Sequence, residues 1–182
     1  MARACVLLAP GFEEIEAVTI IDVLRRAQIE TVAVAVGSKS VQGSHGIALL
    51  GDVTLEQAAT EPWDVVVLPG GMPGAKNLRD SPEVQALIRA QLAAKGRLAA
   101  ICAAPIALSA AGALQGRKAT SYPSFQGELS CAEYLEDPVV VDGPIITSRG
   151  PATALRFALK LVGELCGQER EAAVGKAMLV TD

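Results

Sequence analysis

The stretch Leu98–Pro105, with the sequence LAAICAAP, decides the fold of this chain. The apolar run before Cys102 is typical of a buried strand, and the small residues and proline after it open an alanine-rich helix over 106–113. The sequence therefore predicts a strand, a sharp turn and a helix, with the Cys102 thiol at the turn as in the nucleophile elbow of hydrolases. At a helix N-terminus, we expect the partial positive charge to lower the pKa of this thiol. The alternative is a buried structural cysteine.

The length and composition are those of one α/β domain, which we expect to cover residues 1–182. Hydrophobic residues make up 51% of the chain and aromatic residues only 3%, so the apolar content is mostly Ala, Val and Leu. Such residues suit helices packed on a parallel sheet. A chain of this length buries enough surface on folding to form a core without disulfides.

Charge and cysteine usage exclude several classes of protein. A net charge of -4 argues against nucleic acid or an anionic membrane as an obligate partner. No apolar run reaches the roughly 18 residues of a membrane span. The 4 cysteines form no CxxC pair and there is 1 histidine, so we expect no metal site. We expect a reduced, soluble, cytoplasmic protein.

Strands and helices alternate along the sequence. Apolar runs predict strands over 5–9, 31–36, 64–68, 98–101, 117–121, 139–141 and 144–147. Amphipathic periodicity and capping residues predict helices over 13–27, 82–95, 152–166 and 169–179, besides the one over 106–113. The glycine-punctuated segment 38–52 is typical of a small hairpin. The alternation predicts an open, mostly parallel sheet with helices on both faces, a doubly wound α/β fold.

Four stretches of marked composition follow the predicted strands. In such sheets ligands bind outside the carboxyl ends of the strands. We expect the four to converge on one crevice; they are Ala9–Glu16, Leu68–Gly74, Ile101–Pro105 and Thr147–Pro151. The glycine loop 70–74 does not have the spacing of a nucleotide-binding motif. It is either a tight turn or a set of backbone N–H groups aimed at an oxyanion.

The residue that activates Cys102 is not fixed by periodicity. His45 lies in the predicted hairpin rather than at a strand end, so we expect an exposed loop residue rather than a catalytic base. A protonated carboxyl group could instead stabilise the thiolate by donating a hydrogen bond. Glu13, Glu14 and Glu16 are all candidates, and acids are common at helix N-termini for dipole reasons alone.

Four motifs taken together resemble the ThiJ/PfpI family, and within it a Parkinson-disease-linked branch of small homodimers. They are LLAPGFEEIEAV at 7–18, DVVVLPGG at 64–71, AAICAAP at 99–105 and TSRGP at 147–151. The resemblance implies a flavodoxin-like fold, with the sheet sandwiched by helices, and a homodimer. It also implies that Cys102 is the nucleophile and Glu16 the carboxyl group beside the thiolate. The implied oxyanion site is formed by the backbone N–H groups of Gly70, Gly71 and Ala103.

The resemblance also implies an activity that needs no cofactor. The implied enzyme is a glutathione-independent glyoxalase that converts methylglyoxal into lactate, with deglycation of early glycation adducts as a related reaction. Tyr122 and Arg149 complete the expected substrate-binding residues. The alternative is a redox-sensing stress protein or chaperone whose Cys102 is oxidised to a sulfinate. A cysteine peptidase is a weaker alternative, because Tyr122 stands where many relatives carry histidine.

Overall fold

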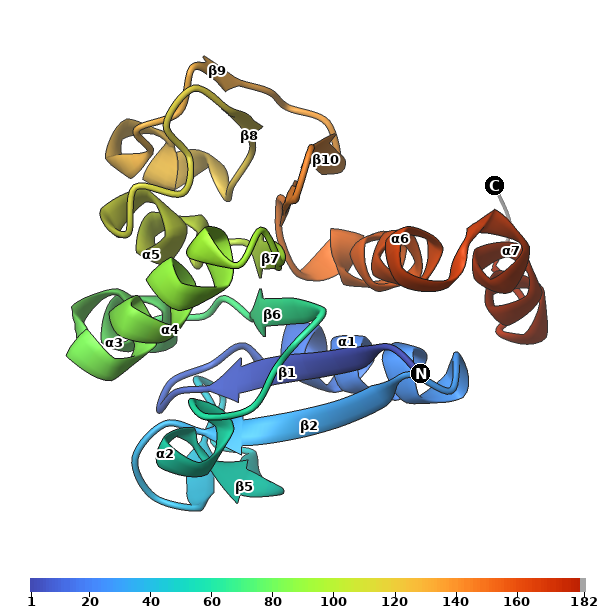
Figure 1. The fold of residues 1–182 in the computed structure, drawn as a ribbon, viewed down its shortest axis with the longest axis horizontal. Coiled ribbons are helices and arrows are strands. Elements are labelled where there is room, and N and C mark those ends of the chain that lie inside the picture. Colours follow the sequence, from blue (N-terminus) through green and yellow to red (C-terminus); the bar gives the residue numbers. More distant parts are fainter. Residues whose placement is uncertain (181–182) are drawn as a thin grey trace.

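A computed structural model describes residues 1–180, and a seven-stranded sheet forms its centre (Figure 1). The order across the sheet is β10-β11-β7-β6-β1-β2-β5. All neighbours pair in parallel except β10 and β11, which form an antiparallel hairpin. The strands are β1 (Arg3–Leu8), β2 (Glu30–Ala35), β5 (Val53–Thr54), β6 (Val65–Leu68), β7 (Arg97–Ile101), β10 (Val139–Asp142) and β11 (Ile145–Ser148). The mostly parallel sheet confirms the predicted fold class.

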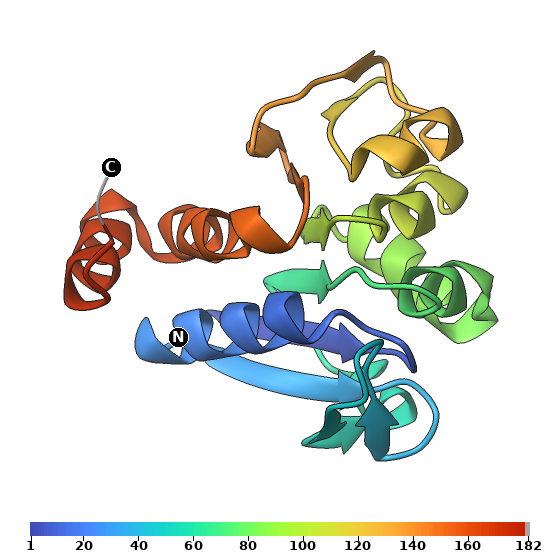
Figure 2. The same ribbon diagram turned by 180° about the vertical axis from the view of Figure 1, so that it is seen from behind.

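Helices cover both faces of the sheet (Figures 1 and 2). One face is covered by α1 (Glu14–Arg26) and α6 (Ala154–Cys166), which pack on each other, and α7 (Gln168–Ala177) packs against α6. The other face carries α3 (Gly74–Asp80), α4 (Pro82–Ala93) and α5 (Pro105–Ala110), while the short α2 (Leu55–Ala58) directly follows β5. The sheet is therefore sandwiched between two helical layers.

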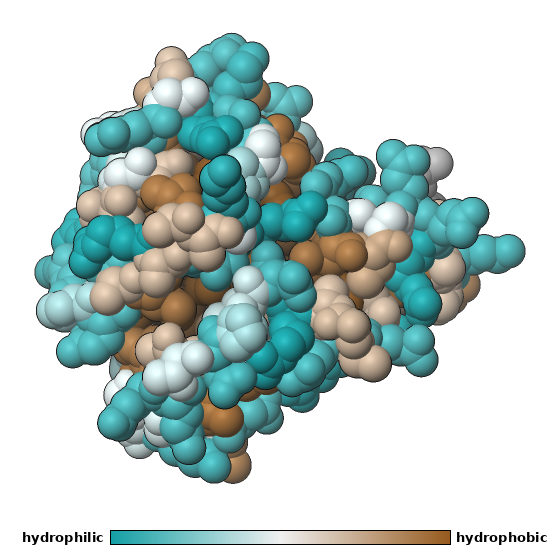
Figure 3. Space-filling view, viewed as in Figure 1, coloured by the Kyte–Doolittle hydropathy of each residue, from teal (hydrophilic) through white to brown (hydrophobic). Residues whose placement is uncertain are grey.

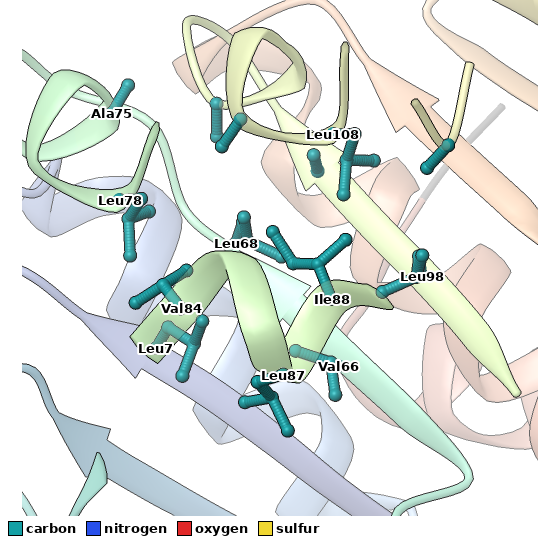
Figure 4. Close-up of a cluster of buried hydrophobic side chains, with 14 of the residues drawn as sticks. Leu7, Val66, Leu68, Ala75, Leu78, Val84, Leu87, Ile88, Leu98 and Leu108 are labelled. Carbon is teal, nitrogen blue, oxygen red and sulfur yellow. The ribbon is translucent and has the colours of Figure 1, made fainter. Parts of the chain in front are cut away.

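The alternation of side chains along β1 builds a separate core on each face. Ala4 and Val6 belong to the core beneath α1 and α6, whereas Cys5 and Leu7 belong to the core beneath α4 and α5. Figure 4 shows the second of these cores, where Leu7, Val66 and Leu68 of the strands lie against side chains of α4 and α5. Because both faces are covered, the central strands are apolar throughout instead of alternating with polar residues.

Two small elements lie outside the main sheet. The predicted hairpin is present as β3 (Ser40–Gln42) and β4 (Ala48–Leu50). The strand expected over 117–121 is reduced to β8 (Lys118–Ala119), which pairs with β9 (Glu133–Tyr134) and not with the central sheet. Short 3-10 turns cover Pro123–Glu128 and Pro151–Thr153. Helix α3 was not expected, because the glycine loop that precedes it has the composition of a turn.

The switch point of the sheet lies at the carboxyl ends of β1 and β6. From β1 the chain continues to β2 on one side, while β6 and β7 lie on the other side, so the strand order reverses at β1. This is where doubly wound sheets bind ligands. The face seen in Figure 3 is mostly hydrophilic, with hydrophobic patches between the polar residues. Over the described residues, no helix has both the length and the hydropathy that crossing a membrane requires.

Candidate active site

Cys102 occupies a strained turn directly after β7. Its φ of 62° lies in the left-handed region, which residues with a side chain rarely adopt. Two backbone hydrogen bonds hold it there: the Cys102 N–H donates to the carbonyl of Ser148 at 2.9 Å, and the Tyr122 N–H donates to the Cys102 carbonyl at 2.8 Å. Such strain persists only where the surroundings over-determine the conformation. The predicted sharp turn is therefore present, and it fixes the direction of the thiol.

Glu16 of α1 is the acid that lies beside this thiol. Its side chain is fully buried, and its Oε2 accepts a hydrogen bond of 2.7 Å from the N–H of Gly70. Gly70 lies between Glu16 and Cys102, and the space around it is too small for a side chain. A Cβ atom on Gly70 would lie 2.6 Å from Cys102 Cβ and 2.7 Å from Glu16 Oε2. Glycine at this position therefore lets the acid and the thiol approach each other.

The pKa values of Glu16 and Cys102 are both raised. Burial raises the pKa of Glu16 to about 7, although hydrogen bonds with the Gly70 N–H and the Cys102 side chain act to lower it. Burial raises the pKa of Cys102 to about 12, and the negative charge of Glu16 adds to the effect. The expected lowering of the Cys102 pKa is therefore wrong. The six-residue α5 offers only a short dipole, whereas the sulfur is enclosed beside an acid.

The two groups titrate as a pair. Two negative charges this close disfavour each other, so the loss of the first proton raises the pKa for the loss of the second. Once the first proton is lost, the pair therefore carries a single negative charge over a wide pH interval. A proton transfer from sulfur to carboxylate moves this charge onto the sulfur without a change in the total.

Two backbone amides face the sulfur, and they differ in part from those expected. The N–H groups of Gly71 and Ala103 donate hydrogen bonds to Cys102, which act to lower its pKa. The N–H of Gly70 was expected in the same oxyanion site, but it donates to Glu16 instead. The Gly70 N–H is not available to an oxyanion because the Glu16 carboxyl group reaches the glycine loop and accepts its hydrogen bond. Gly70 positions the acid, while Gly71 and Ala103 surround the sulfur.

The other two acids at the start of α1 have different partners. Glu13 caps the helix by accepting a hydrogen bond from the N–H of Ile15. Glu14 accepts hydrogen bonds from the N–H of His45 at 2.7 Å and from that of Ile47 at 3.3 Å, and its Oε2 lies 3.0 Å from His45 Nδ1. Burial opposes ionisation of Glu14, but these contacts and its own N–H together lower its pKa to about 2.

His45 is an exposed loop residue, as expected, with 70% of its side chain accessible. Its pKa is raised, first by the hydrogen bond to Glu14 and then by the charges of Glu13 and Glu14. Within residues 1–180, these three residues are the one group whose ligand atoms lie close enough together, within 4.8 Å, to hold a metal ion. The hydrogen bonds between them already account for the arrangement.

Tyr122 and Arg149 both line an open depression of the surface, together with Pro123 and the segment 150–153. The Tyr122 ring packs against Gly150, where an added Cβ would lie 3.4 Å from Cδ2. The guanidinium of Arg149 does not extend free into this depression, because its Nη1 donates to the carbonyl of Glu136 at 2.9 Å. The sequence did not indicate the role of Ser148, whose carbonyl holds the N–H of Cys102. The sequence indicated only that Ser148 lies in one of the four stretches that follow predicted strands.

Comparison with known proteins agrees with this geometry. Residues 2–164 match the model of the DJ-1/PfpI family. Protein dj-1beta of Drosophila melanogaster is 47% identical over 180 residues, which cover 97% of this chain and 96% of that protein. The crystal structure of Drosophila melanogaster DJ-1beta superimposes with a TM-score of 0.96 and covers 100% of this chain and 99% of its own. Glutathione-independent glyoxalase DJR-1.2 of Caenorhabditis elegans is 34% identical over 170 residues, 92% of this chain and 90% of that protein.

The fold and the elbow define a flavodoxin-like α/β protein with a cysteine at the carboxyl end of β7, the strand next to β6. The chain belongs to the DJ-1/PfpI family. The expected family resemblance is therefore confirmed over nearly the whole chain.

Proposed function

We propose that the chain is a glutathione-independent glyoxalase that converts small 2-oxoaldehydes such as methylglyoxal into 2-hydroxy acids. The observation that carries the proposal is the pairing of a strained Cys102 with a buried Glu16 whose pKa is raised to about 7. Such a carboxyl group takes up and releases protons at neutral pH. The similarity to a glutathione-independent glyoxalase supports the same activity. Attack on early adducts of the same aldehydes with proteins is the related deglycase reaction.

The first proposed step joins the thiol to the substrate. The proton of Cys102 moves to the Glu16 carboxylate, and the sulfur attacks the aldehyde carbon to form a hemithioacetal. The N–H groups of Gly71 and Ala103, which point at the sulfur, are the nearest donors for the new alkoxide. The Glu16 proton then neutralises this oxygen, so the acid is again ionised.

The later steps move protons within the bound substrate and add one water molecule. Glu16 removes the proton from the former aldehyde carbon, and an enediolate forms. Glu16 returns this proton to the neighbouring carbon while the hydroxyl proton moves from one oxygen to the other, which gives a thioester of the 2-hydroxy acid. Water then cleaves the thioester, which releases the acid and restores the thiol. The product has the composition of the substrate plus one water molecule, so the reaction requires no external electron acceptor.

The test is a steady-state assay with methylglyoxal and no glutathione, in which lactate is measured. We expect a kcat of about 1 s⁻¹ or more for the natural sequence and no turnover for Cys102→Ser. Cys166→Ser is the matched control, because Cys166 is exposed at the end of α6 and its replacement should leave turnover unchanged. Lactate formation by Cys102→Ser at the natural rate would refute the mechanism.

A redox-sensing role is the second candidate, and one observation favours it. Two N–H groups and a carboxyl group that is neutral below pH 7 surround the Cys102 sulfur, and both kinds of donor could bind the oxygens of a sulfinate. One solved relative, Toxoplasma gondii DJ-1, is described as oxidised, with 37% identity and a TM-score of 0.96. Turnover far below about 1 s⁻¹, with two oxygens added to Cys102 by mild peroxide in intact-mass measurements, would favour this role.

We propose that the protein acts as a cytoplasmic homodimer. Large apolar side chains are exposed side by side on α1 and on the β3–β4 hairpin, namely Ile15, Val18, Ile47 and Leu50. Exposure of such a patch is typical of a protein–protein interface. Light scattering on a sizing column should give the mass of a dimer. Val18→Arg should reduce this to a monomer, whereas Val141→Arg on β10 should not.

A further inference from the structure

The turn of the β3–β4 hairpin places a titratable side chain against the start of α1. Nδ1 of His45 lies 3.0 Å from Glu14 Oε2 and 3.4 Å from Glu13 Oε2. The hydroxyl oxygen of Ser44 lies 3.3 Å and 3.4 Å from the same two oxygens. Both acids are buried, whereas 70% of the His45 side chain is accessible. Protonation of an exposed imidazole therefore changes the net charge beside two buried carboxylates.

Glu13 connects this turn to the site around Cys102. It precedes Glu16 by three residues at the start of α1, so the two side chains lie about one helical turn apart. The Gly70 peptide joins them as well, because its carbonyl accepts a hydrogen bond of 2.8 Å from the Glu13 N–H and its own N–H donates to Glu16. A Cβ on Gly71 would overlap the Glu13 nitrogen. The glycine loop therefore holds Glu13 in a fixed position relative to Glu16.

The charges of these residues act on one another. Burial is the main cause of the raised pKa of Glu16, and the charge of Glu13 adds to it. Protonated His45 carries the opposite charge, so it offsets Glu13 and favours ionisation of Glu16. Within residues 1–180, the other titratable group that acts on Glu16 is Cys102, and the charged groups that act on His45 are Glu13 and Glu14.

We propose that Glu13 and His45 control the pH at which the Cys102–Glu16 pair ionises, with the charge of Glu13 opposing ionisation and protonated His45 promoting it. Both act through Glu16 and are therefore positioning residues, not catalytic residues. The coupling is reciprocal, because ionised Glu16 in turn favours protonated His45. Loss of the His45 proton thus delays ionisation of the pair as the pH rises. The inference concerns regulation of the site described above, and its effect on turnover rests on the proposed function.

The test measures the rate at which iodoacetamide modifies Cys102 from pH 5 to pH 9, by mass spectrometry of the peptide that contains Cys102. Because the thiolate is the reactive form, the rate should rise with an inflection near pH 7, where the pair ionises. Glu13→Gln removes the charge but keeps an oxygen for the Ile15 N–H. It should lower the inflection by about 0.5 pH unit, the effect of two unit charges roughly 6 Å apart in water.

Two variants of His45 test the opposing charge. His45→Gln should raise the inflection by a smaller amount, because its side chain is exposed and solvent screens its charge. His45→Lys keeps a positive charge and should leave the inflection at or below the natural value. Asp22→Asn is the matched control, because it removes a negative charge from the same helix at a position where Arg26 offsets it at 2.6 Å. It should not move the inflection.

The outcomes separate this inference from the glyoxalase proposal. An inflection that neither Glu13→Gln nor His45→Gln moves, or one that Glu13→Gln raises, would overturn the inference. Turnover of methylglyoxal with such unmoved inflections would leave the proposed function intact. Shifts of opposite sign in the two variants, without turnover in the natural sequence, would overturn the proposed function and support the inference. Restoration of the inflection by His45→Lys would show that the charge of residue 45 is responsible.

Discussion

Replacement of Glu16 by glutamine should remove a pH-dependent loss of stability. The pKa of Glu16 is raised from its ordinary value of 4.5 to about 7 in the folded protein. The folded protein thus favours the neutral form of Glu16, and the contribution of this group to the free energy of unfolding is fully present below pH 4.5. It is lost as the pH rises through 7, because the buried carboxyl group must then ionise. At 1.36 kcal/mol per pH unit, the whole interval corresponds to about 3 kcal/mol.

Urea unfolding from pH 4.5 to pH 8 measures this loss. Both proteins should carry Cys102→Ser, so that titration of the thiol does not contribute. Relative to Glu16→Gln, the protein with Glu16 should lose about 3 kcal/mol between pH 4.5 and pH 8. In a chain of this size, that is a decrease in Tm of about 6 to 12 °C.

Glu14→Gln provides the matched control for this measurement. Glu14 is also buried on α1, but its pKa is lowered to about 2, so its contribution is present above pH 4.5 and is lost only as the pH falls toward 2. Its stability curve should therefore keep the decrease that Glu16 causes between pH 4.5 and pH 8, and differ from the unchanged protein only through His45, whose raised pKa depends on Glu14. If the Glu16→Gln curve keeps the decrease as well, the raised pKa of Glu16 is refuted.

Three further predictions concern the same framework. Gly70→Ala should lower kcat/KM for methylglyoxal at least about 100-fold, because the added Cβ would displace Cys102 or Glu16. Gly127→Ala is the control, because a Cβ there meets nothing within 4 Å and should leave kcat/KM unchanged. Equal activity of the two variants would contradict the packing argument. The pH profile of kcat/KM should rise with an apparent pKa near 7, the value at which the pair loses its first proton, and a flat profile from pH 6 to pH 8 would count against Glu16. Leu7→Ala should lower the free energy of unfolding in urea by about 2 to 5 kcal/mol, because Leu7 is fully buried in the core beneath α4 and α5. A decrease below about 1 kcal/mol would show that the core closes the cavity that the substitution leaves.

The main elements of the fold could be predicted because local signals and packing agree. Val65–Leu68 is apolar throughout and is buried on both faces, as its sequence indicates. Ser81 caps α4 through its hydroxyl group, and Pro82 occupies the first helical position, as expected. Helix α3 could not be predicted, because its seven residues are mostly polar and follow a loop of glycine and proline. Its position depends on contacts with α5, which the local sequence does not show.

From the residue pattern alone, without the family resemblance, the site could be predicted only as a set of strand ends. The pattern placed Cys102, the acids of α1 and the glycine loop at one edge of the sheet, where they lie. It could not distinguish Glu13, Glu14 and Glu16, because all three begin the same helix and differ only in tertiary partners. The direction of the Cys102 pKa depends on burial and on the distance to Glu16, and neither is written in the local sequence.

The two margins of the central sheet affect how the protein behaves when crowded. An open strand edge exposes unpaired backbone groups on which a strand of another molecule can add, the first step of amyloid-like aggregation. At one margin β5 is only two residues long and passes directly into α2. At the other, Asp142 of β10 accepts a hydrogen bond from the N–H of Lys118, which brings β8 against that edge. Over residues 1–180 the main sheet therefore offers little free edge for intermolecular strand pairing.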